Sequence, residues 1–293
     1  MSENLTPFSK DGLLSDLRKL GVESGDILLI HSAANTLASV KDLVKAPDTG
    51  MAWLLEALRE AVAPDGIIAV PAFTKTFKDE RDGPAGDTWN PARSPSRVGS
   101  FTNYLRTRPD AVRSDHPTHS IAALGTRAKE FCAGHSWREG ASTFDRGGPW
   151  GKLADWDGKI LWLGTAMTSH TACHVVEDWM RLPYMATCVA LVEENGLIRE
   201  VNVTQSPAGP RDFYREDSKA ARAWDVAGKG RRGKICKADC HLMGAREFID
   251  WLWHALLQEP ALLLSDKHED QWSVEAKKKT AEYLANFKGT WRR

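Results

Sequence analysis

The sequence predicts an α/β fold with a mostly parallel sheet, because short apolar segments alternate with amphipathic helices along the first part of the chain. Residues 9–20 carry leucines at helical spacing and end at Gly21, a residue typical of a helix C-cap. Residues 27–33 form a short apolar run, 51–63 is again helical, and 67–73 is a second apolar run. A strand, a helix and a strand in this order predict a βαβ unit with parallel strands.

Later segments extend this pattern and add an antiparallel element. Residues 98–108 have helical spacing, and 120–125 and 159–164 are typical of two more buried strands. The dipeptide Asn195–Gly196 separates two strand-like runs, which is a strong hairpin signal. We therefore expect an antiparallel β-hairpin added to the mostly parallel core.

The domain organisation predicted from this pattern is one domain over residues 1–293. The segment 185–240 is expected to form a β-rich or irregular appendage, and 245–287 to form two C-terminal amphipathic helices. The polar segment 74–97 is rich in Pro and Gly, which indicates a long loop. Loops of this length within a compact domain are often functional.

Charge and cysteine content exclude several classes of protein. Lys and Arg together number 39 and equal Asp plus Glu, so no overall field attracts nucleic acid or an anionic membrane. The N-terminal residues do not have the pattern of a signal peptide, and no apolar run approaches the length of a membrane span. Five unevenly spaced cysteines favour reduced thiols over a disulfide framework, which indicates a cytoplasmic protein.

The densest group of reactive side chains follows the strand-like run 159–164. His170, His174 and Glu177 share one face of a helix, because residues four and seven positions apart coincide there. An imidazole beside a carboxylate makes a general base, and the end of a strand is where open α/β sheets bind ligands. Two alternatives remain: histidines that only pack or cap the helix, and a zinc site built from the same three residues.

A second candidate lies at the end of the first predicted strand. His31 and Ser32 are followed by the small residue Ala33, so backbone N–H groups there stay accessible to the amides and phosphates of a pantetheine cofactor. The alternative is an ordinary histidine at a strand end. Gly148 and Pro149 belong to a glycine-rich segment that matches no phosphate-loop spacing.

Polar segments supply candidates for substrate binding. Asp115 and His116 precede a predicted strand and are expected to line a cleft, although they also suit an ordinary loop that enters a strand. Asp79 and Glu80 in the long loop, and Asp212 further on, could hold a polyamine or could be simply solvated. Cys236, Cys240 and His241 have no second Cys/His pair nearby, so we expect no metal site.

Five segments of the sequence together resemble the aminoglycoside 3-N-acetyltransferase family. The resemblance spans almost the whole chain, with the RS-x-HP-x-x-S pattern before a strand as its most recognisable part. It is carried, in order, by GDILLIHSA (25–33), PDGIIAVPAFT (64–74), the block 95–125 that contains RSDHPTHS, the block 147–164 and TACHVVEDWMRLPY (171–184).

The resemblance implies a three-layer α/β/α sandwich and acetyl transfer from acetyl-CoA as co-substrate, without a metal. It implies His174 as the general base, Glu177 as its orienting partner and His31 in the active site. The expected cofactor contacts are His31, Ser32, Ala33, Thr74, Ser120, Gly148 and Pro149, and the expected substrate contacts are Asp79, Glu80, Asp115, His116, His170 and Asp212. For the oxyanion of the reaction, backbone N–H groups near Ser32 and the Thr74 hydroxyl are the candidate donors.

The expected reaction is acetylation of the 3-amino group of a 2-deoxystreptamine aminoglycoside by a cytoplasmic antibiotic-resistance enzyme. Thr168 and His170 stand where the family has an Asp and an Asn, so a different small amine, such as an aminophosphonate, remains an alternative acceptor. A zinc-dependent hydrolase, a serine hydrolase using Ser32 or Ser120, and a non-catalytic binder are the rival classes. We expect a small-molecule amine as partner and neither nucleic acid nor membrane, and a homodimer is a possible assembly.

Overall fold

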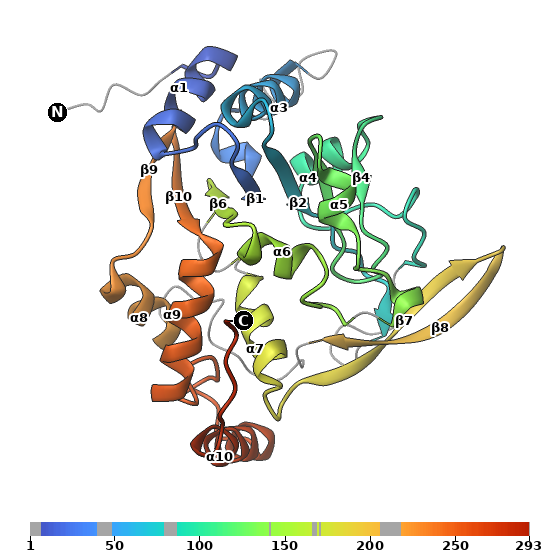
Figure 1. Cartoon of the computed structure of the whole chain (residues 1–293), viewed down its shortest axis with the longest axis vertical. Coiled ribbons are helices and arrows are strands. Elements are labelled where there is room, and N and C mark those ends of the chain that lie inside the picture. Colours follow the sequence, from blue (N-terminus) through green and yellow to red (C-terminus); the bar gives the residue numbers. More distant parts are fainter. Residues whose placement is uncertain are drawn as a thin grey trace.

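The central element of the computed structural model is a seven-stranded sheet (Figure 1). The structure describes residues 7–39, 49–78, 87–140, 142–165, 169, 171–205 and 218–292. The strands of the sheet lie in the order β4 (Val112–Arg113), β5 (Ile121–Leu124), β2 (Ile67–Pro71), β1 (Ile27–Ser32), β6 (Lys159–Leu163), β10 (Ala238–Gly244) and β9 (Arg231–Ile235).

The direction of most strands confirms the predicted sheet. β1 pairs in parallel with both β2 and β6, which makes the buried centre of the sheet parallel. β5 is antiparallel to β2, and β10 is antiparallel to β6. The outermost strands, β4 and β9, turn back again, so only β5 and β10 run against the common direction.

Helices cover both faces of the sheet, which confirms the three-layer sandwich. On one face, Leu28 and Ile30 of β1 share a core with α1 (Lys10–Leu20), α3 (Thr49–Val62) and α4 (Ser100–Arg106). On the other, Ile27 and Leu29 share a core with α5 (Ala128–Cys132), α6 (Pro149–Asp155), α7 (Ala172–Met180), α8 (Lys219–Ala227), α9 (Ala245–Gln258) and α10 (Gln271–Ala285). Alternate residues of one central strand therefore serve two cores, as a two-residue strand period requires.

The caps of α1 show how local sequence sets the helix boundaries. Ser9 is the N-cap, and its hydroxyl accepts a hydrogen bond from the Gly12 backbone N–H at 3.1 Å. Gly21 ends the helix with a φ of 105°, a left-handed conformation that glycine adopts without strain. The structure therefore confirms both predicted ends of this helix to within a residue.

The predicted hairpin forms a second sheet that extends away from the central body (Figure 1). β7 (Ala186–Glu194) and β8 (Leu197–Gln205) are antiparallel, and the two-residue turn has positive φ at both Asn195 (52°) and Gly196 (77°). These are the residues that such turns favour. β3 (Phe77–Lys78), from the long loop after β2, pairs with the other side of β7.

The strands of the segment 185–240 belong to two different sheets. β7 and β8 stand apart from the central sheet, whereas β9 and β10 complete one of its edges. The sequence of β9, RRGKI, is mostly exposed, because the strand lies at the edge of the sheet. Edge strands of this kind are charged and lack the apolar signal of a buried strand, so the pattern did not reveal it.

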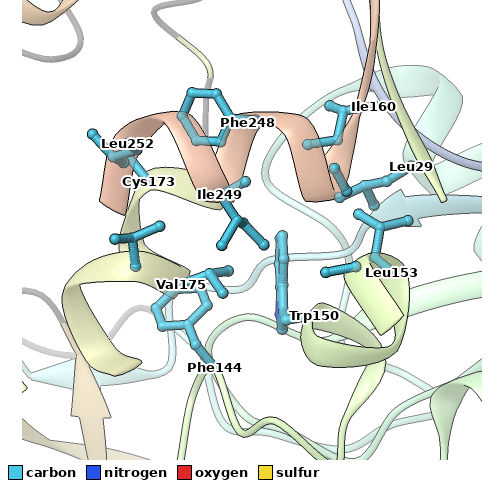
Figure 2. Close-up of a cluster of buried hydrophobic side chains, with 14 of the residues drawn as sticks. Leu29, Phe144, Trp150, Leu153, Ile160, Cys173, Val175, Phe248, Ile249 and Leu252 are labelled. Carbon is cyan, nitrogen blue, oxygen red and sulfur yellow. The ribbon is translucent and has the colours of Figure 1, made fainter. Parts of the chain in front are cut away.

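A large apolar core lies between the sheet and α9 (Figure 2). Ile249 projects from α9 toward Val175 of α7 and Trp150 of α6, and Phe248 and Leu252 belong to the same cluster. Close packing of this kind holds α7 in place over the edge of the sheet. Among the described helices, none is both long and apolar enough to cross a membrane.

We expect Phe248→Ala to lower the free energy of unfolding by about 3 to 5 kcal/mol, because it removes a fully buried ring and leaves a cavity. Urea denaturation of the purified protein measures this change. Val226→Ala is the control, since Val226 is 88% exposed on α8 and its truncation should change stability by less than about 0.5 kcal/mol. Equal effects of the two substitutions would contradict the packing described.

Candidate active site

A cavity of about 340 Å³ opens at one edge of the central sheet. Its volume lies within the range of small-molecule sites, about 300 to 1,000 Å³. The described residues that line it come from the ends of β1, β2 and β6 and from the segments at the start of α4, β5 and α7: His31, Ser32, Pro71, Phe73, Val98, His119, Thr165, Ser169, Thr171 and His174.

The mixed direction of the sheet explains why these residues meet. The carboxyl ends of the parallel strands β1, β2 and β6 share one edge. β5 runs the other way, with Ile121 opposite Pro71, so the amino end of β5 lies at this same edge. His119, just before β5, therefore joins His31 at the end of β1 and His174 in α7 around one cavity.

His174 and Glu177 form a hydrogen-bonded pair at the cavity. The Nδ1 of His174 lies 2.6 Å from Oε2 of Glu177, and the hydroxyl of Tyr184 donates to Oε1 of the same carboxylate at 2.7 Å. Glu177 is fully buried, whereas His174 retains 6% exposure and lines the cavity. A carboxylate that accepts the Nδ1–H leaves Nε2 with the lone pair, which is the arrangement of a general base.

His31 is buried at the end of β1 beside Trp162. The two rings lie 6.2 Å apart and are nearly parallel, at 13°. Burial lowers the pKa of His31 to about 4, so its ring is neutral at physiological pH. Among the described residues, neither the Nε2 of His31 nor the Oγ of Ser32 has a hydrogen-bond partner. Both residues line the cavity, as expected from the sequence, and their predicted roles stay predictions.

His119 also lines the cavity, and sequence reasoning missed it. Its ring contacts Phe73 and Phe144, with centroid distances of 4.5 and 5.3 Å, and its Nδ1 lies 3.0 Å from the hydroxyl of Thr118. Burial, assisted by the nearby charge of His174 when protonated, lowers the pKa of His119 to about 3. The available signal was its position directly before a buried strand, which mirrors that of His31 at a strand end.

Thr74 and Ser120 hold strand edges together instead of lining the cavity. The hydroxyl of Thr74 donates to the backbone carbonyl of Pro117, and that of Ser120 donates to the carbonyl of Ala72 at 2.8 Å. The backbone N–H of Ala33 donates to Leu163 at 3.0 Å. None of these three residues is among the described residues that line the cavity. Their predicted contact with the cofactor gains no support from this arrangement.

The remaining described candidates lie elsewhere. Asp115 accepts a hydrogen bond from the indole of Trp89 at 2.9 Å, and His116 is fully buried against His135 with a centroid distance of 4.5 Å. Gly148 and Pro149 begin α6. None of these four predicted residues is among the described residues of the cavity wall. Asp79, Glu80, His170 and Asp212, with Thr168, lie outside the described residues.

Cys173, His174 and Glu177 are the described residues whose donor atoms come within 4.8 Å of one another, as a metal site requires. The separation of 2.6 Å between Nδ1 and Oε2 is that of a hydrogen bond. Two ligands of one tetrahedral zinc, each at about 2.0 Å, lie about 3.3 Å apart. In this conformation His174 and Glu177 are therefore paired with each other and not spaced to share an ion.

The chain is similar to known proteins in both sequence and fold. The family model for aminoglycoside 3-N-acetyltransferase matches residues 29–256. The chain is 28% identical over 272 residues to aminoglycoside N(3)-acetyltransferase VII of Streptomyces paromomycinus. The alignment covers 84% of this chain and 90% of that protein.

Two solved structures share its fold. AAC-IIIb in a binary complex with CoASH matches with a TM-score of 0.72 and 23% identity, over 89% of this chain and 99% of that one. A mutant of aminoglycoside acetyltransferase AAC(3)-IVa in complex with a gentamicin matches with a TM-score of 0.73 and 22% identity, over 94% and 97%. With a family model that covers most of its length, the chain belongs to the aminoglycoside 3-N-acetyltransferase family.

Proposed function

We propose that the protein transfers an acetyl group from acetyl-CoA to the 3-amino group of a 2-deoxystreptamine aminoglycoside. The observation that carries the proposal is the hydrogen-bonded pair of His174 and Glu177 on the wall of a cavity at the sheet edge. Membership of the family supports the reaction. The complexes of AAC-IIIb with CoASH and of AAC(3)-IVa with a gentamicin support the two substrates.

The pair supplies the proton transfer that an amine requires. An ammonium group has no lone pair, so it must lose a proton before the nitrogen attacks a thioester. His174 accepts this proton on Nε2, while Glu177 holds Nδ1–H and stabilises the imidazolium that forms. Tyr184 occupies the other carboxylate oxygen and thereby keeps Glu177 directed at His174.

The covalent step joins the amine nitrogen to the acetyl group and releases the coenzyme. The amine nitrogen forms a bond to the thioester carbonyl carbon, and the carbonyl electron pair moves to oxygen. When the carbonyl re-forms, the C–S bond breaks and the coenzyme leaves as a thiolate. The proton held by His174 neutralises that thiolate, and the acetylated nitrogen loses its second proton to solvent, so the products are an acetamide, free CoA and one proton. Positioning both substrates in one cavity contributes further, up to about 7 to 11 kcal/mol of the barrier in the best cases.

The charge state of the cavity suits a cationic acceptor. Burial keeps the pKa values of His31 and His119 at about 4 and about 3, so both rings are uncharged at neutral pH. Neutral rings do not repel an incoming ammonium, whereas two imidazolium groups would. An aminoglycoside carries several ammonium groups and fits this requirement.

The proposal is tested by free thiol released from acetyl-CoA in the presence of candidate amines. We expect release with aminoglycosides that contain 2-deoxystreptamine and little with polyamines or aminophosphonates. If only an aminophosphonate or another amine gives thiol release, the reaction is still acetyl transfer but the acceptor is not an aminoglycoside. Absence of release with every amine, or release that a chelator abolishes and zinc restores, would overturn the proposal. A cytoplasmic location and a homodimer stay predictions.

A further inference from the structure

The hydroxyl of Thr118 lies between the imidazoles of His116, which is buried, and His119, which lines the cavity. Its Oγ1 is 3.3 Å from Nδ1 of His116 and 3.0 Å from Nδ1 of His119. Thr118 is 1% exposed, and His116 is fully buried. A hydroxyl has one hydrogen, so it can donate to only one of these nitrogens and must accept from the other.

The other nitrogen of His116 decides the direction of these two hydrogen bonds. Nε2 of His116 is buried and has no hydrogen-bond partner among the described residues. A buried N–H without an acceptor is rarer than a buried acceptor without a donor, so the hydrogen of His116 belongs on Nδ1. His116 then donates to Thr118, and Thr118 donates to Nδ1 of His119. The hydrogen of neutral His119 is consequently on Nε2.

This assignment gives the cavity a donor that is held in place. His119 lines the cavity, and Thr118 occupies its Nδ1, so Nε2–H is the ring group available to a bound molecule. The ring of His119 and the ring of His174 both contact Phe144, with centroid distances of 5.3 and 5.7 Å. A group that reaches Nε2 of His174 therefore lies close to His119 as well.

Most other polar atoms at the described wall are already bonded or are not accessible. The Oγ of Ser32 and the Nε2 of His31 are buried below the surface of the cavity. The hydroxyls of Thr165 and Ser169 bond to each other at 2.9 Å, which occupies one of their two hydrogens and leaves the other able to donate. Thr171 is the other described residue of the wall that carries a hydroxyl. Of the donors expected from the sequence, the Thr74 hydroxyl and the Ala33 N–H bond to backbone carbonyls.

We propose that His119 is a catalytic residue, whose Nε2–H donates a hydrogen bond to the thioester carbonyl oxygen and stabilises the oxyanion. This role rests on the proposed acetyl transfer. During attack by the amine, the carbonyl electron pair moves to the oxygen, and the hydrogen bond strengthens as the charge grows. His119 keeps its proton throughout, and it is His174 that gains one. Thr118 and His116 are positioning residues, because they act on the tautomer of His119.

The tautomer is tested directly by NMR of protein labelled with ¹⁵N in histidine. Long-range ¹H–¹⁵N spectra at pH 7 show which ring nitrogen carries hydrogen, and the signals that disappear in His119→Gln identify His119. We expect hydrogen on Nε2 of His119 in the wild type and a mixture of both tautomers in Thr118→Val. Hydrogen on Nδ1 in the wild type would overturn the proposal, whatever the acetyl-transfer assay shows.

The catalytic role is tested by two substitutions of His119. Phe fills the space but has no donor, so we expect His119→Phe to lower kcat by about 10² to 10³-fold. Gln provides an amide N–H but cannot act as a base, so His119→Gln should recover at least about tenfold of that loss. Binding of CoA by calorimetry and thermal unfolding of each variant separate this effect from misfolding.

The activities of the two His119 variants distinguish a hydrogen-bond donor at His119 from a base at His119 and from a donor at Thr171. Equal loss in His119→Phe and His119→Gln, in folded proteins that bind CoA, would mean that His119 acts as a base, and would overturn the donor role. Full turnover in His119→Phe together with a loss in Thr171→Val would assign the donor to Thr171. If the wild type releases no CoA with any amine, the proposed function fails, whereas full turnover in His119→Phe refutes only the role of His119.

Discussion

His174→Ala lowers kcat/KM for amine-dependent CoA release by about 10² to 10⁴-fold, the range of general-base catalysis. The substitution removes the imidazole that faces the cavity and leaves Glu177 bonded to Tyr184. Steady-state thiol release, measured over a series of amine concentrations, gives kcat and KM separately. Because the lost step is proton transfer, we expect the decrease mainly in kcat.

Glu177→Gln provides the companion measurement. An amide keeps the size of the carboxylate but carries no charge to stabilise the imidazolium, so the loss should lie below that of His174→Ala and above about tenfold. Tyr184→Phe removes only one hydrogen bond to Glu177 and should have the smallest effect of the three. His254→Gln is the control, because His254 lies on α9 with 65% of its side chain exposed. Full turnover in a folded His174→Ala protein would end the assignment.

Those parts of the fold that depend on local patterns were predictable from the sequence. The helix ending at Gly21 and the turn at Asn195–Gly196 follow from residues that suit a left-handed backbone, and the structure confirms both. The central strands β1, β2 and β6 are mostly apolar because both of their faces are buried.

Those parts that depend on distant pairings were not predictable. The direction of β5 leaves no mark on its own sequence, because a short apolar strand looks the same in either direction. β9 is charged and exposed at the sheet edge, so its place in the central sheet depends on pairing with β10. Without the direction of β5, the sequence could not show that His119 reaches the cavity beside His31.

The same distinction holds for the site. His174 and Glu177 are three residues apart in one helix, so their pairing could be predicted from spacing. Tyr184 reaches Glu177 only because the chain turns back after α7, where Arg181 adopts a left-handed conformation with a φ of 53°. The tautomer of His119 depends on Thr118 and His116, and no pattern of residue types reveals which nitrogen of a ring has a partner.

Acidification is expected to unfold the protein near pH 5, because four histidines with strongly lowered pKa values resist protonation in the folded state. Burial lowers the pKa of His31 and His135 to about 4 and that of His119 to about 3, and the pKa of His116 lies well below its usual value. In the unfolded chain each group titrates near its ordinary pKa of about 6.5. Below that pH the unfolded state binds more protons than the folded state, so stability falls as pH falls.

The lowered pKa values of the four histidines set the pH range over which stability falls and the size of the decrease. Stability is independent of these groups above about pH 7 and decreases between about pH 6.5 and pH 4, where only the unfolded state is protonated. Each group contributes about 1.4 kcal/mol per pH unit, so four lower the free energy of unfolding by on the order of 5 kcal/mol per unit. This is comparable to the whole stability of many domains, about 5 to 15 kcal/mol. Burial raises the pKa of Asp178. Protonation of this one carboxyl group therefore favours the folded state as the pH falls and opposes the effect of the histidines.

Urea unfolding at a series of pH values from 7.5 to 5.5 (about half a unit apart) measures the slope, which gives the difference in bound protons between the two states. We expect a difference of about three to four protons near pH 5.5. Val226→Ala, at an exposed position without a titratable group, should leave the slope unchanged. A difference of about one proton or less would mean that these rings are accessible to protons in the folded state. In that case the cavity would carry positive charge at mildly acidic pH, and an ammonium acceptor would bind progressively less well there, which acceptor KM values measured at the same pH values would show.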